Sequence, residues 1–213
     1  GMMSSHPWNV AIVSRWADIL PMVSQNKQID LVVFWAHDLL QIPTVRHVYH
    51  WSNVFVAVSQ FHAMSMFHPC PENTAEMTEA VMPNGVDLGM FRLDPEPERQ
   101  FGKLIWTSNP NRGLPSAVRK LRDIRKRFGK QFELHIYGRA ANYGWTPDHE
   151  AAWIANIDEP GVYLHEGLPK QELARELMSS WAFFYPSHWP ETFGISALEA
   201  QAATLENQVA SLT

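Results

Sequence analysis

The feature that most constrains the fold is a regular alternation of apolar runs and helical patterns over the second half of the chain. The apolar runs are KLIWTS, FELHIYG, VYLHEG and AFFYPS, and the helical patterns are LPSAVRKLRDIRKRF, KQELARELMSS and ISALEAQAA. The stretch between FELHIYG and VYLHEG is a polar and aromatic excursion. Short strands that alternate with helices of this length form parallel sheets through right-handed crossovers. The sequence therefore predicts an α/β fold with a Rossmann-like second half.

The first half contains further strand candidates, but its alternation of strands and helices is less regular. WNVAIV, LVVFWA, VFVAV and EAVMP have the composition of buried strands, and the weakly helical ADILPMVSQ separates the first two. The segment LDPEPERQFGK, rich in proline and charge, is typical of a linker or surface loop. We therefore predict a partial amino-terminal domain over residues 1–85, a second domain over residues 86–203 and a tail over residues 204–213.

Composition excludes several classes of protein. The chain of 213 residues is 46% hydrophobic and 18% charged, with a formal net charge of −5, so no overall positive field favours nucleic acid. The single cysteine, Cys70, rules out an internal disulfide framework and is typical of a reducing compartment. No apolar run reaches the roughly 18 residues that span a bilayer, and GMMSSHPWNV lacks the features of a signal peptide. We expect a cytoplasmic protein.

The first helix of the second half, LPSAVRKLRDIRKRF, is strongly amphipathic. Leu114, Val118, Leu121 and Phe128 recur near the helical period and are predicted to face the sheet. The other face and the residues just after it are basic: Arg119, Lys120, Arg122, Arg125, Lys126, Arg127 and Lys130. This basic face over residues 114–130 is either simply solvated or a contact for an anionic membrane surface.

The ends of the predicted strands carry residues suited to a nucleotide. In open α/β sheets ligands bind at the carboxyl ends of strands, where helix amino termini favour anions. Arg112 and Gly113 follow the first strand of the second half and precede a helix, which suits a diphosphate. Gly138 ends the next strand, where backbone can approach a flat ligand. Backbone groups of Gly167 and Leu168, after the third, could contact a base edge.

The fourth strand end holds two carboxylates eight positions apart in SHWPETFGISALEAQAA. Glu191 lies in the predicted loop, and Glu199 lies beyond the first turn of the helix that begins near Gly194. A carboxylate accepts two hydrogen bonds side by side, which matches a vicinal diol of a sugar. Amides of Phe193, Gly194 and Ile195 would face the same crevice. Alternatively, Glu191 is a helix-capping acid and Glu199 a solvent-facing residue.

These residues resemble a known family. PSHWPETFGISALEAQAA is similar to the Glu-x7-Glu signature of the retaining nucleotide-sugar glycosyltransferases of the GT-B fold, the group 1 or family 4-like enzymes. MPNGVDLGMF is similar to the segment that links their two Rossmann-like domains, and TSNPNRGL resembles their donor-phosphate loop. The resemblance runs from about residue 30 to residue 203. It implies a partial amino-terminal, acceptor-side domain and most of a carboxy-terminal donor-binding domain, apparently truncated at both ends.

The resemblance assigns roles to individual residues. It implies that Glu199 holds the ribose hydroxyls and that Glu191, with backbone at Phe193 and Gly194, contacts the transferred sugar and the diphosphate. Arg112 stands where the family has a phosphate-binding lysine, whereas Thr107 stands where it usually has an arginine. FWAHDL resembles the strand end at which a histidine faces the donor sugar, so His37 is the catalytic-face candidate; a core or capping histidine is the alternative. The strand FELHIYG brings Tyr137 and Gly138 into the expected donor site.

The implied function is transfer of a sugar from a nucleoside diphosphate donor, with retention of configuration, to an unknown glycan, lipid or small-molecule acceptor. No Asp-x-Asp pair or nucleotide-binding glycine fingerprint occurs, so we expect no metal and no cofactor. A non-catalytic nucleotide-sugar-binding fragment and a GT-B-fold nucleotide-sugar epimerase are the alternatives. A sheet that lacks its later strands would expose an edge, which a homodimer could cover.

Overall fold

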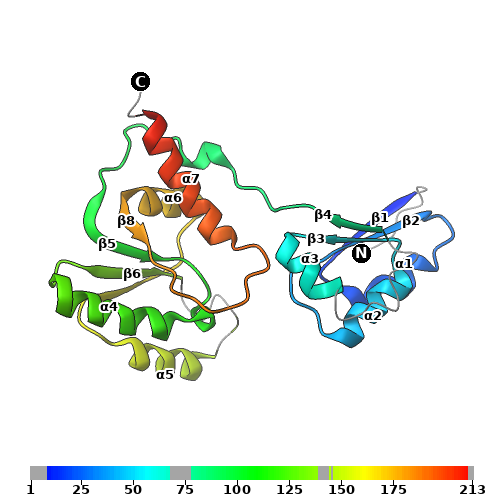
Figure 1. Cartoon of the computed structure of the whole chain (residues 1–213), viewed down its shortest axis with the longest axis horizontal. Coiled ribbons are helices and arrows are strands. Elements are labelled where there is room, and N and C mark those ends of the chain that lie inside the picture. The colour runs from blue at the N-terminus through cyan, green and yellow to red at the C-terminus, as the bar shows by residue number, and fades with distance from the viewer. Residues whose placement is uncertain (1–8, 68–77, 139–143, 145, 211–213) are drawn as a thin grey trace. The chain divides into compact units, whose positions relative to one another are not determined.

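The structure is a computed structural model that describes residues 9–67, 78–138, 144 and 146–210, so Cys70 lies outside the described residues. The chain divides into two compact units. The first comprises Gly1–Gly85 with Glu191–Phe193, and the second comprises Val86–Pro190 with Gly194–Thr213. Each unit contains a four-stranded, wholly parallel sheet (Figure 1). The predicted α/β class with parallel sheets is therefore confirmed.

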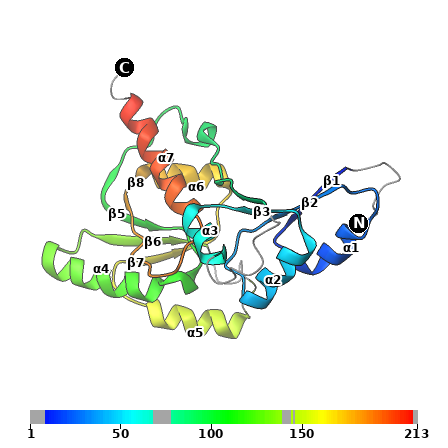
Figure 2. The same ribbon diagram turned by 45° about the vertical axis from the view of Figure 1, so that its right-hand side comes forward.

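The first unit is a sheet with the strand order β1-β2-β3-β4. Its strands are β1 (Val10–Ser14), β2 (Leu31–Trp35), β3 (Val54–Ala57) and β4 (Thr78–Val81). Its helices are η1 (Ala17–Ile19), α1 (Leu20–Ser24), α2 (Ile42–Trp51) and α3 (Gln60–Phe67). Helices α1 and α2 lie along the same side of the sheet (Figure 2). All four strands fall on the apolar runs that predicted them, because β-branched and aromatic side chains pack well on a pleated surface.

The second unit has the strand order β7-β6-β5-β8. Its strands are β5 (Gln100–Trp106), β6 (Glu133–Tyr137), β7 (Val162–His165) and β8 (Ser180–Phe183). The chain moves from β5 to β6 to β7 in one direction and then returns to place β8 on the other side of β5. The direction of the strand order thus reverses between β5 and β8. In open parallel sheets this reversal leaves a crevice at the carboxyl ends of the two strands.

Helices cover both faces of the second sheet. They are α4 (Leu114–Phe128), α5 (Pro147–Ile157), α6 (Lys170–Ser179) and α7 (Ile195–Ala210). Two short 3-10 helices, η3 (Leu88–Phe91) and η4 (Pro110–Arg112), belong to the same unit. Figures 1 and 2 show α4 and α5 on one face and α6 and α7 on the other. Leu134 and Ile136 pack in the core under α4 and α5, whereas Ile105 packs in the core under α6 and α7. The sheet therefore has two separate apolar layers.

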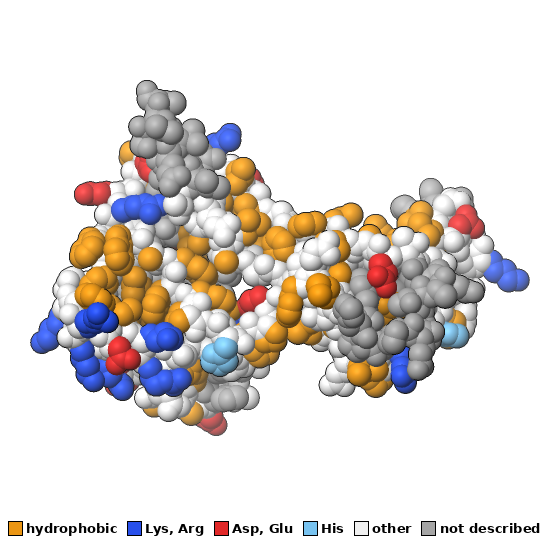
Figure 3. Space-filling model, viewed as in Figure 1, with side chains coloured by type: hydrophobic (Ala, Val, Ile, Leu, Met, Phe, Trp, Pro, Cys, Tyr) orange, Lys and Arg blue, Asp and Glu red, His pale blue; other side chains and the backbone are white. Residues whose placement is uncertain are grey.

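Helix α4 has the predicted bounds because local signals fix both of its ends. Gly113 and Gly129 flank it with φ angles of 113° and 115°, which glycine adopts without strain, and Pro115 lies in its first turn. Its leucine and valine positions are buried as predicted, but Phe128 is 57% exposed, so the prediction that Phe128 faces the sheet is wrong. Figure 3 shows Lys and Arg side chains gathered over α4, with hydrophobic side chains directly above them.

Several other element boundaries differ from the sequence predictions. The excursion after β6 contains α5, which begins at Pro147 with two acids in its first turn and buries Trp153 and Ile157 on one side. Strand β5 begins three residues earlier than predicted, inside the expected linker, and β8 begins two residues earlier. Helix α7 extends beyond the predicted ISALEAQAA to Ala210.

Candidate functional site

Ser187, a residue that sequence reasoning did not select, links the loop that follows β8 to the turn that follows β5. Ser187 Oγ donates a hydrogen bond to the Arg112 carbonyl, and the Trp189 amide donates to Ser187 Oγ over 3.0 Å. A Cβ placed on Gly113 would lie 3.6 Å from the Ser187 Cα, so the two loops touch. The loop that follows β8 is therefore joined to the turn that follows β5. Because 75 positions separate the two residues, only the fold could pair them.

A second link holds the start of α7 beside β5. Ser108 is buried, its hydroxyl lies 3.3 Å from the Ser196 hydroxyl in the first turn of α7, and its carbonyl accepts a 2.7 Å bond from the Trp106 indole. These contacts fix Ser196 next to the end of the strand that the Arg112 turn also follows. Two helix amino termini, those of α4 and α7, are thus attached to neighbouring strand ends.

Both helix starts have the geometry that suits an anion. Gly113 precedes α4 and Gly194 precedes α7, each with a positive φ angle, 113° and 79° respectively. The amides of Ala197 and Leu198 are the first in α7 to bond back to Gly194, so the amides before them have no partner in the preceding helical turn. Such amides, together with the helix dipole, favour negative charge. Arg112 is the last residue of η4 and lies directly before Gly113, so it adds a cation at the start of α4.

Glu199 lies in the second turn of α7 and is not a solvent-facing residue. Its side chain is only 7% exposed, and Lys170 Nζ forms an ion pair with its Oε1 atom. Lys170 is the first residue of α6, so the pair joins α6 to α7. The alternative of a solvated helix position is therefore wrong for Glu199.

The other predicted donor residues have mixed surroundings. Gly138 is buried with a φ angle of 109°, Gly167 is exposed, and Leu168 packs against the core under α6 and α7. Tyr137 is buried, and its hydroxyl donates a 2.6 Å hydrogen bond to Glu176 on α6. The side chain of Tyr137 is thus engaged beneath α6, and only its backbone is suited to contact a ligand.

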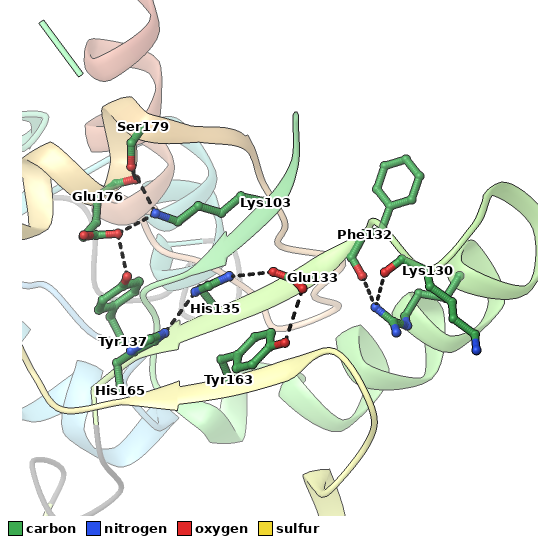
Figure 4. A network of polar contacts seen from close by, with 11 residues as sticks. Lys103, Lys130, Phe132, Glu133, His135, Tyr137, Tyr163, His165, Glu176 and Ser179 are labelled. Atoms are coloured by element: carbon green, nitrogen blue, oxygen red, sulfur yellow. Dashed lines mark hydrogen bonds and ion pairs between the residues drawn. The ribbon is translucent and has the colours of Figure 1, made fainter. Parts of the chain in front are cut away.

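Tyr137 belongs to a polar network on the α6 side of the sheet that the sequence analysis missed (Figure 4). Lys103 Nζ lies 2.7 Å from Glu176 Oε2 and 3.1 Å from the Ser179 hydroxyl. Burial acts to raise the pKa of Glu176, but hydrogen bonds from Lys103 and Tyr137 outweigh it and lower that pKa. Burial and the Glu176 charge raise the pKa of Tyr137.

Two histidines continue this network across β6 and β7. His135 Nδ1 lies 3.0 Å from His165 Nε2, and the two rings are stacked with an interplanar angle of 7°. One ring nitrogen must donate and the other accept, so the contact requires at least one neutral ring. Burial and the nearby Lys103 ammonium lower the pKa of His135, and burial also lowers the pKa of His165. The fold therefore favours the neutral pair.

In the first unit, His37 follows β2 and packs against Trp35, with ring centroids 5.1 Å apart. Burial and the Arg15 cation lower the pKa of His37, which favours the neutral imidazole. His62, which sequence reasoning missed, is fully buried and accepts a bond from the Val58 amide through Nδ1. Its Nε2 therefore carries the proton and donates to the Asp38 carbonyl over 3.0 Å. His62 thus fixes the turn that carries His37.

The first unit also includes residues 191–193, so the two glutamates of the motif fall in different units. The Thr192 hydroxyl donates a 2.8 Å hydrogen bond to the His37 carbonyl, and Ser59 Oγ donates to the Thr192 carbonyl. Ser59 also accepts a 3.0 Å hydrogen bond from the His62 amide, so it caps the start of α3. Glu191 and Phe193, on either side of Thr192, are partly buried.

Neither a metal centre nor a membrane span is found in the described part of the chain. Within it, no three side chains of the His, Cys, Asp and Glu types are grouped so as to hold a metal ion. None of the helices that the structure describes is long and apolar enough to cross a bilayer.

Comparison with known proteins identifies the fold. Residues 107–205, which carry the crevice and Glu199, match the family model described as glycosyl transferases group 1. Over 92% of the chain the structure is similar to Anabaena HepE in complex with UDP and glucose, with a TM-score of 0.70 and 15% identity. The chain therefore has the GT-B fold. Sucrose-phosphate synthase from Thermosynechococcus elongatus matches 93% of the chain with a TM-score of 0.70 and 13% identity. TarM of S. aureus matches 90% with a TM-score of 0.65 and 14% identity.

The chain spans only part of these GT-B proteins. It covers 57% of HepE, 55% of the sucrose-phosphate synthase and 39% of TarM. No curated protein matches the sequence. The family match, residues 107–205, falls in the second unit except for residues 191–193, which belong to the first.

Proposed function

We propose that the chain is part of a retaining, metal-independent glycosyltransferase that binds a nucleoside diphosphate sugar at the carboxyl ends of β5 to β8. The observation that most supports a donor site is the Ser187 bridge, since it joins the Arg112 turn to the loop before α7. Two helix amino termini and one arginine then lie at the strand-order reversal, where open α/β sheets bind nucleotides.

The proposed reaction requires neutralisation of the negative charge that develops on the departing diphosphate. Arg112 and the first-turn amides of α4 and α7 supply it through hydrogen bonds that are already oriented, which is the usual largest contribution to such a step. The Glu199 carboxylate accepts hydrogen bonds from the ribose hydroxyls, and its burial fixes its orientation for this contact. In the first unit, neutral His37 is suited to donate a hydrogen bond to a sugar hydroxyl. Glu191 is proposed to contact the transferred sugar and the diphosphate. The spacing of Glu191 and Glu199 supports the retaining outcome by resemblance to the family.

The similar structures suggest the donor to test first. HepE was solved with UDP and glucose and also with UDP-glucose, which supports a uridine donor here. The acceptor is a glycan, lipid or small molecule. Because the chain spans about half of HepE, a non-catalytic nucleotide-sugar-binding fragment is the second candidate.

Calorimetric titration with UDP, GDP and ADP tests the donor site. One nucleotide should bind, and Glu199→Ala and Arg112→Ala should each weaken it by about 1 to 3 kcal/mol, as expected for hydrogen bonds to charged groups. Arg119→Ala, an exposed arginine on α4, is the matched control and should bind like the wild type. A folded chain that binds none of the three nucleotides would contradict the proposal.

Turnover separates the candidate functions. Release or transfer of the sugar from a radiolabelled donor supports the transferase, and binding without either supports the non-catalytic fragment. Recovery of an epimerised sugar supports the epimerase. Retention is read from the anomeric configuration of the first-formed product, and an inverted product contradicts that part of the proposal.

The basic face of α4 supports peripheral contact with an anionic membrane. Arg122 is paired with Glu159, and Arg125 donates to the Lys130 carbonyl, but Lys120 and Lys126 are exposed on the same helix. Cosedimentation with phosphatidylglycerol vesicles but not phosphatidylcholine vesicles, lost in Lys120→Glu/Lys126→Glu and at high salt, is the expected result. Equal sedimentation with both lipids contradicts it.

The exposed edges of the second sheet support a homodimer. β7 and β8 each pair with a described strand on one side only, and an unpaired edge is a template for another chain. Light scattering should give twice the chain mass at high concentration, and a monomer there would exclude this arrangement.

A further inference from the structure

Lys170 stands in a position that its own helix does not favour. It is the first residue of α6, directly after Pro169, and a cation there opposes the partial positive charge of the helix amino terminus. A residue that breaks a local rule needs a compensating interaction elsewhere. The described contacts supply one, because Lys170 Nζ is paired with the Glu199 carboxylate.

The two partners of this pair differ strongly in burial. The Lys170 side chain is 63% exposed, whereas that of Glu199 is 7% exposed. Water would solvate Lys170 without a partner, but a carboxylate removed from water requires a counter-charge or hydrogen bonds. The contact therefore matters mainly to Glu199. It fixes the orientation of the carboxylate and balances its charge from the solvent side.

The geometry leaves room for a ligand on the same carboxylate. Lys170 contacts Oε1, and an ionised carboxyl group offers about four lone-pair sites over its two oxygens. Lys170 also follows Gly167 and Leu168, the loop whose backbone is the candidate for contact with the nucleobase. One side chain thus connects that loop to the carboxylate proposed for the ribose.

We propose that Lys170 is a positioning residue for the donor nucleotide: it holds Glu199 so that both carboxylate oxygens face the vicinal hydroxyls of the ribose. The inference rests on the proposed donor site. Lys170 acts through Glu199, so its removal affects binding only to the extent that the ligand has the two hydroxyls.

A diol-dependent binding cycle tests this role. UDP and 2′,3′-dideoxy-UDP are titrated into the wild type, Lys170→Met, Lys170→Arg, Glu199→Gln and the double variant Lys170→Met/Glu199→Gln. Lys170→Met should weaken UDP about 10-fold and dideoxy-UDP less than about 2-fold, in line with loss of one charge-assisted hydrogen-bond partner. Lys170→Arg should keep most of the affinity. The double variant should bind UDP no more weakly than Glu199→Gln alone, since both changes remove the same interaction.

The outcomes separate this inference from the donor site on which it rests. If Lys170→Met weakens both ligands equally, the lysine acts on the diphosphate or on the fold, and the positioning role is refuted. If Lys170→Met leaves UDP binding unchanged while Glu199→Gln weakens it, the positioning role is refuted but the donor site stands. If the wild type binds no UDP, GDP or ADP, the proposed function fails and this inference fails with it. Lys120→Met on α4 controls for loss of an exposed lysine.

Discussion

Glu176→Gln should destabilise the second unit far more than its exposure suggests. The substitution removes the charge that faces Lys103. The Lys103 side chain is 9% exposed, and the Ser179 hydroxyl is the hydrogen-bond partner that it then keeps among the described residues. Removing one partner of a buried ion pair costs about 3 to 5 kcal/mol. Glu176 is 29% exposed, so water relieves part of this cost, and we expect about 2 to 3 kcal/mol.

Lys103→Met is the informative counterpart. It leaves Glu176 with the hydrogen bond from Tyr137 and with partial access to water, so it should cost only about 1 kcal/mol. The double variant Lys103→Met/Glu176→Gln leaves no buried unpaired charge. Its cost should therefore be smaller than the sum of the single costs by more than the roughly 0.5 kcal/mol that additivity allows.

Hydrogen exchange measures these effects within one unit of a two-unit chain. Peptides covering β5 and β6 should exchange about 30- to 150-fold faster in Glu176→Gln, since each tenfold corresponds to about 1.4 kcal/mol. Peptides covering β2, in the other unit, should be unchanged and serve as the internal control. Equal, additive effects of the two single variants would refute the reasoning, because they would show that the Lys103 ammonium does not depend on Glu176.

Three further predictions follow from the same contacts. The fold lowers the pKa values of His135 and His165, so the stability that their neutral forms contribute should be complete above the unfolded pKa of about 6.5 and should be lost as the pH falls below it. Hydrogen exchange of the β6 and β7 amides, corrected for intrinsic exchange rates, measures this pH dependence. The pH profile should flatten in the double variant His135→Phe/His165→Phe. Ser187→Ala should weaken nucleotide binding about 5- to 10-fold, since loss of the bond to the Arg112 carbonyl frees the loop, and unchanged affinity in calorimetry would contradict this. Chelation with EDTA should leave nucleotide affinity unchanged, whereas restoration by added Mg²⁺ after a loss would overturn the metal-independent proposal.

Local sequence signals predicted much of the fold because the signals and the elements they specify are close in the chain. The apolar runs placed each of the eight described strands to within a few residues, and Gly113, Pro115 and Gly129 fixed α4. The same kind of signal was present for α5, where Pro147 is followed by an acidic first turn and by Trp153 and Ile157 four positions apart. That helix was missed because its polar and aromatic composition resembles a loop, although its spacing does not.

The candidate site was only partly accessible to sequence reasoning. Glu199, Arg112 and the helix starts at Gly113 and Gly194 follow from where strands end and helices begin, and parallel strands bring such ends to one edge of a sheet. Phe128 shows the limit of periodicity, since it has the spacing of a core residue but lies at the end of α4, where it remains exposed.

The sequence by itself determined the alternation of strands and helices, and therefore the two parallel sheets and the edge at which polar side chains gather, because each depends on neighbours within a few residues. Tertiary structure alone decided which distant groups meet. Ser187 with Arg112, His135 with His165 and Lys170 with Glu199 are 75, 30 and 29 positions apart. Short hydrogen bonds and ion pairs need positions set to a fraction of an ångström, which only the packing of helices against the completed sheet provides.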